Sequence, residues 1–378
     1  MKAIIAVLSL FLIFAVLLDA FEAIVLPRRV TRQFRLTRFF YQAAWSPSAA
    51  LARHISSSSR REAFLGFFGP LSLILLLSIW AVGLIMGFGA LHWSLGSPIH
   101  LVEGSESFWS YVYLSGTTFF TLGYGDVTPR APLGRALTIA EAGMGFGFLA
   151  LIIGYVPVIY QAFSRREASI TLLDARAGSP PSAAELLRRH GHRVEELEHL
   201  LRDWEHWAAD LLESHLSYPV LCYYRSQHKN QSWLTSLTAI LDASALVMAG
   251  IEGISTGQAR LTFAMARHAV VDLGHVFNTP PRDPVHDRLP SEELNRVRQM
   301  LAGAGIKFGD GPMVEKRLTD FRRMYEPYIT PLADYLLLTL PSWTPAPNAF
   351  DNWQTSKWGR VSLGSGGPGS SSRDEEHF

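Results

Sequence analysis

Three long apolar stretches, all near the N-terminus, constrain the fold of this 378-residue chain more than any other feature. The first, residues 3–26, is interrupted by only two charges, Asp19 and Glu22. Residues 63–91 and 142–163 form the second and third. At ~1.5 Å per helical residue, each is long enough to cross a hydrocarbon core about 30 Å thick. We therefore expect an all-α membrane protein whose first part holds three spans.

The basic residues predict how these spans are oriented. Eight arginines separate the first span from the second, and two follow the third: Arg28, Arg29, Arg32, Arg35, Arg38, Arg53, Arg60 and Arg61, then Arg165 and Arg166. Residues 92–129, between the second and third spans, contain neither Lys nor Arg. Because basic residues stay on the cytoplasmic side of a membrane, we predict that this loop and the N-terminus face outward. The C-terminus would lie in the cytoplasm of a bacterial cell.

Residues 1–26 allow a second interpretation. A removable signal peptide also has a basic residue, here Lys2, before an apolar core. However, this apolar stretch is longer than a usual signal core and arginines follow it, which favours a retained transmembrane anchor over residues 1–27.

The outward loop contains alternating glycines suited to holding a dehydrated cation. Residues 121–125 read Thr-Leu-Gly-Tyr-Gly. Consecutive carbonyls form an oxygen cage only if all point to one side, which requires backbone angles that alternate between left- and right-handed regions. Gly123 and Gly125 tolerate the left-handed angles and stand at alternate positions. Thr121 adds a hydroxyl at the inner end, and the ring of Tyr124 can wedge this segment against its scaffold.

Together with Asp126, this segment closely resembles the potassium-channel signature Thr-Val-Gly-Tyr-Gly-Asp, with Leu122 as one aliphatic replacement. The amphipathic residues 106–120 before it resemble a re-entrant pore helix. Over residues 63–163 the chain is thus similar to bacterial potassium channels with two spans and one pore loop, here with an added N-terminal span. The resemblance implies a passive, potassium-selective channel. It also implies a homotetramer, because one signature supplies a quarter of the cage. K⁺ is then the permeant ion, and no cofactor is implied.

The resemblance leaves the bracing of the filter's outer end open. Thr117 stands where some relatives have a glutamate that pairs with the aspartate equivalent to Asp126. Tyr113 stands where some have a tryptophan.

Glu141 is the one acid inside the third span, at a depth that matches the filter and its helix. A carboxyl in a membrane is costly unless it is paired, hydrogen-bonded or wetted. We expect Glu141 to accept a hydrogen bond from Ser115, Thr117 or Thr118 and so to brace the filter. The alternative is a carboxyl that is merely protonated among lipids or helices.

Two residues are candidates for a gate in the third span. Gly145 falls where the potassium-channel family usually places a hinge, and Pro157 removes a backbone hydrogen bond and kinks a helix. Both are also common in membrane helices that do not bend.

The basic residues 28–62 predict a juxtamembrane segment that contacts anionic lipids. Arg29, Arg32, Arg35 and Arg38 have the spacing of a voltage-sensing helix, but such a span would lack partner helices with counter-charges. A helix on the cytoplasmic leaflet explains the same residues and can use nearby apolar side chains at the interface: Phe34, Leu36, Phe39 and Phe40.

Residues 164–345 predict a cytosolic, all-helical domain. Apolar residues from Leu187 to Leu211 alternate in steps of three and four, as in a seam between helices. Residues 233–251 are apolar enough for a fourth span, but Asp242 and repeated Ser and Thr favour a buried helix. No Gly-x-Gly-x-x-Gly follows a strand, so a nucleotide-binding regulatory domain is not expected, and any ligand or partner stays unassigned. The Gly- and Ser-rich residues 346–378 are expected to be disordered.

The remaining classes of function find less support. With a formal net charge of +1, nothing favours nucleic acid as a partner. No metalloprotease, P-loop or nucleophile-elbow motif is present, so an enzyme is not expected, nor a metal other than K⁺. A weakly selective cation channel remains open, as does a membrane sensor or scaffold with a poorly conducting pore.

Overall fold

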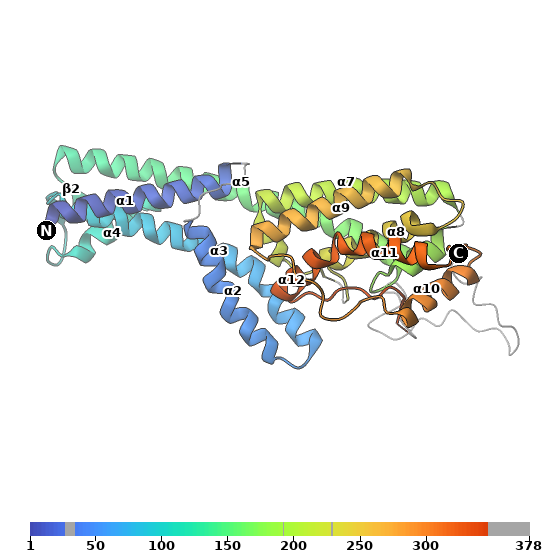
Figure 1. The fold of residues 1–378 in the computed structure, drawn as a ribbon. Helices are drawn as coiled ribbons and strands as arrows, with labels where there is room; N and C mark the ends of the chain where they lie inside the picture. Colours follow the sequence, from blue (N-terminus) through green and yellow to red (C-terminus); the bar gives the residue numbers. More distant parts are fainter. Residues whose placement is uncertain (27–34, 192, 228–229, 347–378) are drawn as a thin grey trace, which may run out of the picture.

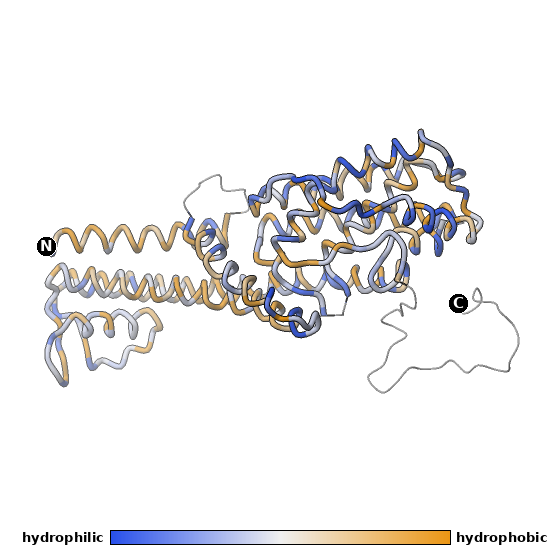
Figure 2. The backbone as a smooth tube through the Cα atoms, turned by 60° about the horizontal axis from the view of Figure 1, so that its bottom comes forward, coloured by the Kyte–Doolittle hydropathy of each residue, from blue (hydrophilic) through white to orange (hydrophobic). Residues whose placement is uncertain are grey.

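The computed structural model describes residues 1–26, 35–191, 193–227 and 230–346, in an elongated molecule with two parts end to end (Figure 1). One part contains three long helices side by side with a short one: α1 (Lys2–Ala20), α3 (Ser58–Ser94), α5 (Pro132–Ala177) and α4 (Phe108–Phe119). The second part is a bundle of the later helices. Hydropathy separates the same parts, because the long helices are apolar along most of their length while the bundle is mixed (Figure 2).

Among the described residues, four helices are long and apolar enough to cross a membrane: Lys2–Val25, Ser58–Ser94, Pro132–Ala177 and Trp233–Gly250. The first three contain the three predicted stretches, and the all-α membrane fold is confirmed. They are longer than the apolar stretches alone, since α3 begins at Ser58 and α5 continues to Ala177. Residue 163 is therefore not a helix boundary.

Helix α1, which ends in a π-helical turn at Phe21–Val25, packs against α3 through small residues. A Cβ on Gly87 would lie 2.7 Å from Cγ1 of Ile13, so the two helices approach as closely as a glycine allows. The buried carboxylate of Asp19 accepts hydrogen bonds from the indole nitrogen of Trp80 (3.0 Å) and the hydroxyl of Thr37 (2.6 Å). Asp19 therefore joins α1 to α2 and α3.

Helix α2 (Leu36–His54) forms a hairpin with the start of α3. Phe40, expected at the lipid interface, is instead buried, whereas Phe39 is 69% exposed. The indole of Trp45 donates to the carbonyl of Tyr335 in the bundle (3.0 Å). Arg35 is extended and precedes the helix, which contradicts a sensor helix running from Arg29 through Arg38.

Part of the predicted basic segment and most of the predicted tail are not among the described residues. Residues 27–34, which include Arg28, Arg29, Arg32 and Phe34, lie outside the described residues. The same is true of residues 347–378 in the predicted tail.

The loop between α3 and α5 is folded back on itself. Its ends pair as a short antiparallel sheet of β1 (Ile99–Leu101) and β2 (Val127–Pro129), which the sequence did not predict. Between the strands, Ser107 caps α4 by accepting the amide of Ser110, which starts the helix at Phe108. The N-terminus lies at this same end of the molecule (Figure 1), as the predicted topology requires.

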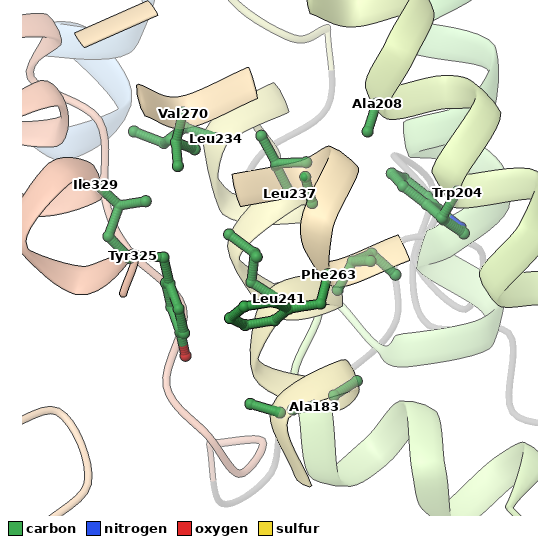
Figure 3. Close-up of a cluster of buried hydrophobic side chains, with 14 of the residues drawn as sticks. Ala183, Trp204, Ala208, Leu234, Leu237, Leu241, Phe263, Val270, Tyr325 and Ile329 are labelled. Carbon is green, nitrogen blue, oxygen red and sulfur yellow. The ribbon is translucent and has the colours of Figure 1, made fainter. Parts of the chain in front are cut away.

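The bundle surrounds α8 (Trp233–Gly250) with other helices: α6 (Ala183–His190), α7 (Val194–Ser217), α9 (Thr256–Phe277), α10 (Ser291–Gly303), α11 (Pro312–Arg323) and α12 (Glu326–Leu336). A short 3₁₀ helix, η2 (Pro219–Tyr223), follows α7. Of the most apolar stretch of α8, 89% is buried within the chain. Figure 3 shows its Leu237 and Leu241 among side chains of α7, α9 and α12. The helix is thus a core element, as its polar residues indicated.

The predicted seam packs inside this bundle, but it is not one helix. Helix α6 ends at His190 and α7 starts at Val194. Leu197, Leu201 and Leu211 are nevertheless buried in the core of the same chain. Helical spacing therefore predicted the buried face and missed the break.

Candidate functional site: the ion pathway

The backbone of residues 121–125 alternates as a ladder of carbonyls requires. Thr121, Gly123 and Gly125 have positive φ angles of 56°, 58° and 79°. Leu122 and Tyr124, between them, do not. Alternation of this kind can turn successive carbonyls to one side.

Thr121 was not expected in the left-handed region. A residue with a Cβ adopts this conformation at a cost of roughly 1–2 kcal/mol, so the surrounding contacts must hold it. Its amide donates to the carbonyl of Thr118 (2.9 Å), and the amide of Leu122 donates to that of Thr117 (2.8 Å). The end of α4 thus holds the beginning of the ladder. The sequence contained one indication of this conformation. Thr121 stands two residues before Gly123, just as Gly123 stands two residues before Gly125.

The outer end of the segment is held by a tyrosine. The hydroxyl of Tyr113 on α4 donates to Oδ2 of Asp126 (2.8 Å), and Oδ1 accepts the amide of Val127 (3.0 Å). The hydroxyl of Thr117 instead donates to the carbonyl of Leu114 (3.0 Å). Tyr113 therefore supplies the brace that the sequence left open.

Two glycines let α4 sit tightly between its neighbours. A Cβ on Gly89 of α3 would lie 2.9 Å from Cα of Val112, and a Cβ on Gly145 of α5 would clash with the carbonyl oxygen of Phe119. Gly145 thus has a packing reason to be glycine, whatever its part in bending. Sequence reasoning missed Gly89, which lies in a helix with other glycines.

Glu141 is fully buried against α4. Its Oε1 forms a hydrogen bond with the hydroxyl of Ser115, which also donates to the carbonyl of Ile85 on α3 (2.8 Å). Of the three donors considered, Ser115 is the one that contacts Glu141. Ile85, Ser115 and Glu141 therefore join α3, α4 and α5 behind the ladder.

Of the two candidate gating residues, Gly145 packs against the end of α4, whereas Pro157 lies further along α5. Helix α5 continues unbroken through Gly145 and Pro157, which are separated by about 18 Å along it. Below Pro157, the buried guanidinium of Arg166 donates to the carbonyls of Leu221 (2.9 Å) and Tyr224 (3.0 Å). It also lies 3.1 Å from Nε2 of His215. Arg166 therefore fastens the third span to the bundle.

Much of the carbonyl ladder and of α5 is uncovered in one chain. Tyr124 is 69% exposed and Leu122 52%. Only 17% of the most apolar stretch of α5 is buried, against 44% for α3. The exposed side chains of Ile139, Phe146 and Ile153 follow one another at seven-residue intervals along α5. An apolar stripe with this spacing is typical of helices that pack against one another.

Comparisons with known proteins agree with this arrangement. A family model described as "Ion channel" matches residues 73–161. The uncharacterized membrane protein YdjJ of Bacillus subtilis is 22% identical over 236 residues, which cover 61% of this chain and 68% of that protein. Protein LctB of Geobacillus stearothermophilus is 41% identical over 58 residues, or 15% of this chain and 38% of that protein.

No solved structure matches the chain. The matched segment runs from within α3, through α4 and the ladder, to the part of α5 that precedes Arg166. Residues 73–161 are thus similar to an ion-channel domain.

Proposed function

We propose that four copies of this chain form a passive, potassium-selective pore in the cell membrane. The carbonyls of residues 121–125 form the ion-binding cage. One observation carries the proposal: left-handed angles alternate at Thr121, Gly123 and Gly125 in a loop between two membrane helices. Such carbonyls replace the hydration shell of a dehydrated K⁺ ion. The potassium gradient drives the flow.

The need for several subunits follows from what one chain leaves open. A single ladder offers oxygens to one side of an ion only. The exposure of Tyr124 and the apolar stripe of Ile139, Phe146 and Ile153 support neighbouring copies around a central axis. Four-fold closure surrounds the ion and gives these side chains helices or lipid to contact.

The support of the filter follows from the contacts behind it. Asp126 is held by Tyr113, and Glu141 by Ser115. Thr117 contributes its carbonyl, which accepts the amide of Leu122, rather than its hydroxyl. In this proposal, Gly145 and Pro157 are the places where α5 bends when the pore opens below the filter.

The described part of the basic segment supports contact with lipid head groups. Arg35 and Arg38 border a cavity of about 340 Å³ where α1, α2 and α5 meet the bundle. Arg35 forms an ion pair with Glu22 (3.4 Å), whereas Arg38 is exposed. With the predicted topology, this cavity lies at the cytoplasmic leaflet and the bundle in the cytoplasm.

A flux assay on the purified full-length protein in liposomes tests the proposal. A potassium gradient should drive rapid K⁺ flux that empty liposomes lack, and native mass spectrometry should give a complex of four chains. Flux of K⁺ and Na⁺ at similar rates would favour the weakly selective channel. A well-folded protein without flux would favour the sensor or scaffold.

A further inference from the structure

A histidine that no contact above explains is buried behind the filter. His92, near the outer end of α3, is 0% exposed. Within the described residues, neither of its ring nitrogens has a hydrogen-bond partner. An imidazole without partners is costly in a buried site, and more so among membrane helices. We therefore looked for a polar group close enough to form a hydrogen bond with His92.

One polar atom without a partner near His92 is a carboxyl oxygen of Glu141. Among the described residues, Oε2 of Glu141 also lacks a hydrogen bond, and it lies 4.0 Å from Nε2 of His92. A small rotation of either side chain, or one bridging water, closes this gap. The two orphaned groups then satisfy each other.

The positions of three residues on α3 show why His92 lies close to Glu141. Ile85, Gly89 and His92 lie at positions i, i+4 and i+7 of α3, on one face. Ile85 receives the hydroxyl of Ser115, and Gly89 makes room for the backbone of α4. His92 continues the same face toward Glu141 of α5.

The hydrogens can be arranged so that Ser115, both oxygens of Glu141 and Nε2 of His92 are paired without a net charge. A hydroxyl has one proton, and Ser115 donates it to the carbonyl of Ile85. A protonated Oε1 of Glu141 then donates to the oxygen of Ser115. The remaining oxygen, Oε2, accepts from Nε2–H of His92. This chain of bonds suits a region where an unpaired charge is costly.

We propose that His92 is a positioning residue for the filter, acting through Glu141 and Ser115 to join the outer, pore and inner helices at one point. His92 does not touch the ion. Its role is to keep the Glu141 carboxyl in the orientation in which it holds α4 and hence the start of the carbonyl ladder. This inference rests on the proposed pore, because its functional readout is conduction.

A double-mutant cycle tests this coupling in the full-length protein. His92→Leu and Glu141→Leu remove the two polar groups with limited change in volume. His92→Leu should lower the conducting fraction about tenfold, and Glu141→Leu at least as much because it also removes the contact with Ser115. The double variant should lower it no further than Glu141→Leu, since His92 acts through Glu141. The melting temperatures of the detergent-solubilised oligomer should be non-additive in the same way.

Two further variants separate this role from packing. His92→Gln keeps a side-chain donor within reach of Glu141 and should restore most of the conduction lost in His92→Leu. Leu73→Ala, in a buried position of α3 about five turns away, should combine additively with Glu141→Leu. The inference would be overturned if the losses of conduction in His92→Leu and Glu141→Leu multiplied in the double variant. It would also be overturned if His92→Leu behaved as wild type. If wild-type protein does not conduct, the pore proposal fails, and the melting cycle still decides whether the contact exists.

Discussion

The two halves of this molecule differ in how much of their apolar surface is buried within one chain. In the bundle, α8 is enclosed by helices of its own chain, and its core is closed. In the pore half, the ladder and one face of α5 are uncovered. The sequence contains apolar helices in both halves, so hydropathy alone does not distinguish them. The difference teaches that the core of the bundle closes within one chain, whereas the proposed pore is completed by neighbouring copies.

The largest loss of K⁺ flux is expected from a substitution in the carbonyl ladder, where the backbone conformation determines ion binding. Gly125 and Gly253 both have a φ of 79°, and a Cβ on either would meet nothing within 4 Å. Gly125→Ala should abolish K⁺ flux, because a Cβ opposes the angle that orients the carbonyls. Gly253→Ala, in the bundle, imposes the same strain and should leave flux intact. Equal loss of flux in both variants would show that general strain, rather than the ladder, matters.

A charge in the closed core should unfold the bundle. Leu201 on α7 is 1% exposed, whereas Leu261 on α9 is 55% exposed. Leu201→Asp should destabilise the bundle by about 3–5 kcal/mol, as an uncompensated buried charge does. Leu261→Asp is the matched control and should hardly change the melting temperature. If Leu261→Asp were equally destabilising, that face of the bundle would be buried in the assembly.

The junction between the halves should respond to acid. Burial and the neighbouring guanidinium of Arg166 hold the pKa of His215 well below its usual value. The unfolded chain binds a proton at this histidine near pH 6.5 and the folded chain does not. Stability is therefore complete above about pH 7 and falls below about pH 6.5, by up to about 1.4 kcal/mol per pH unit.

Thermal unfolding across this pH range measures that dependence. His215→Gln, which keeps a hydrogen-bonding side chain but does not titrate, should flatten the curve between pH 6.5 and the point of general acid unfolding. An unchanged pH dependence in this variant would mean that other groups govern the acid response.

The smallest effect concerns the outer brace. Tyr113→Phe removes the hydrogen bond to Asp126, worth about 1 kcal/mol, and should increase the non-conducting fraction about fivefold. Tyr160→Phe, on an exposed part of α5, is the control and should behave as wild type. Recordings of sustained current compare the two. Identical behaviour would mean that Asp126 needs no brace.

The sequence predicted what depends on local pattern and missed what depends on how helices approach one another. Apolar length predicted the three spans, and repeated polar residues separated α8 from them. Ser115 was one of three candidate partners of Glu141, because the rotation of α4 cannot be read from spacing. Gly89, His92 and the contact between Asp19 and Trp80 were missed, since each depends on two helices distant in sequence. The break at Gly191 was missed because both helices keep the same buried face.

The central claim, selectivity by the carbonyls of residues 121–125, is tested most directly by the reversal potential with K⁺ on one side of a bilayer and Na⁺ on the other. A cage that replaces the hydration shell of K⁺ predicts a reversal potential close to that of K⁺ alone, with little inward Na⁺ current. A reversal potential near zero in a conducting, tetrameric preparation would contradict the account.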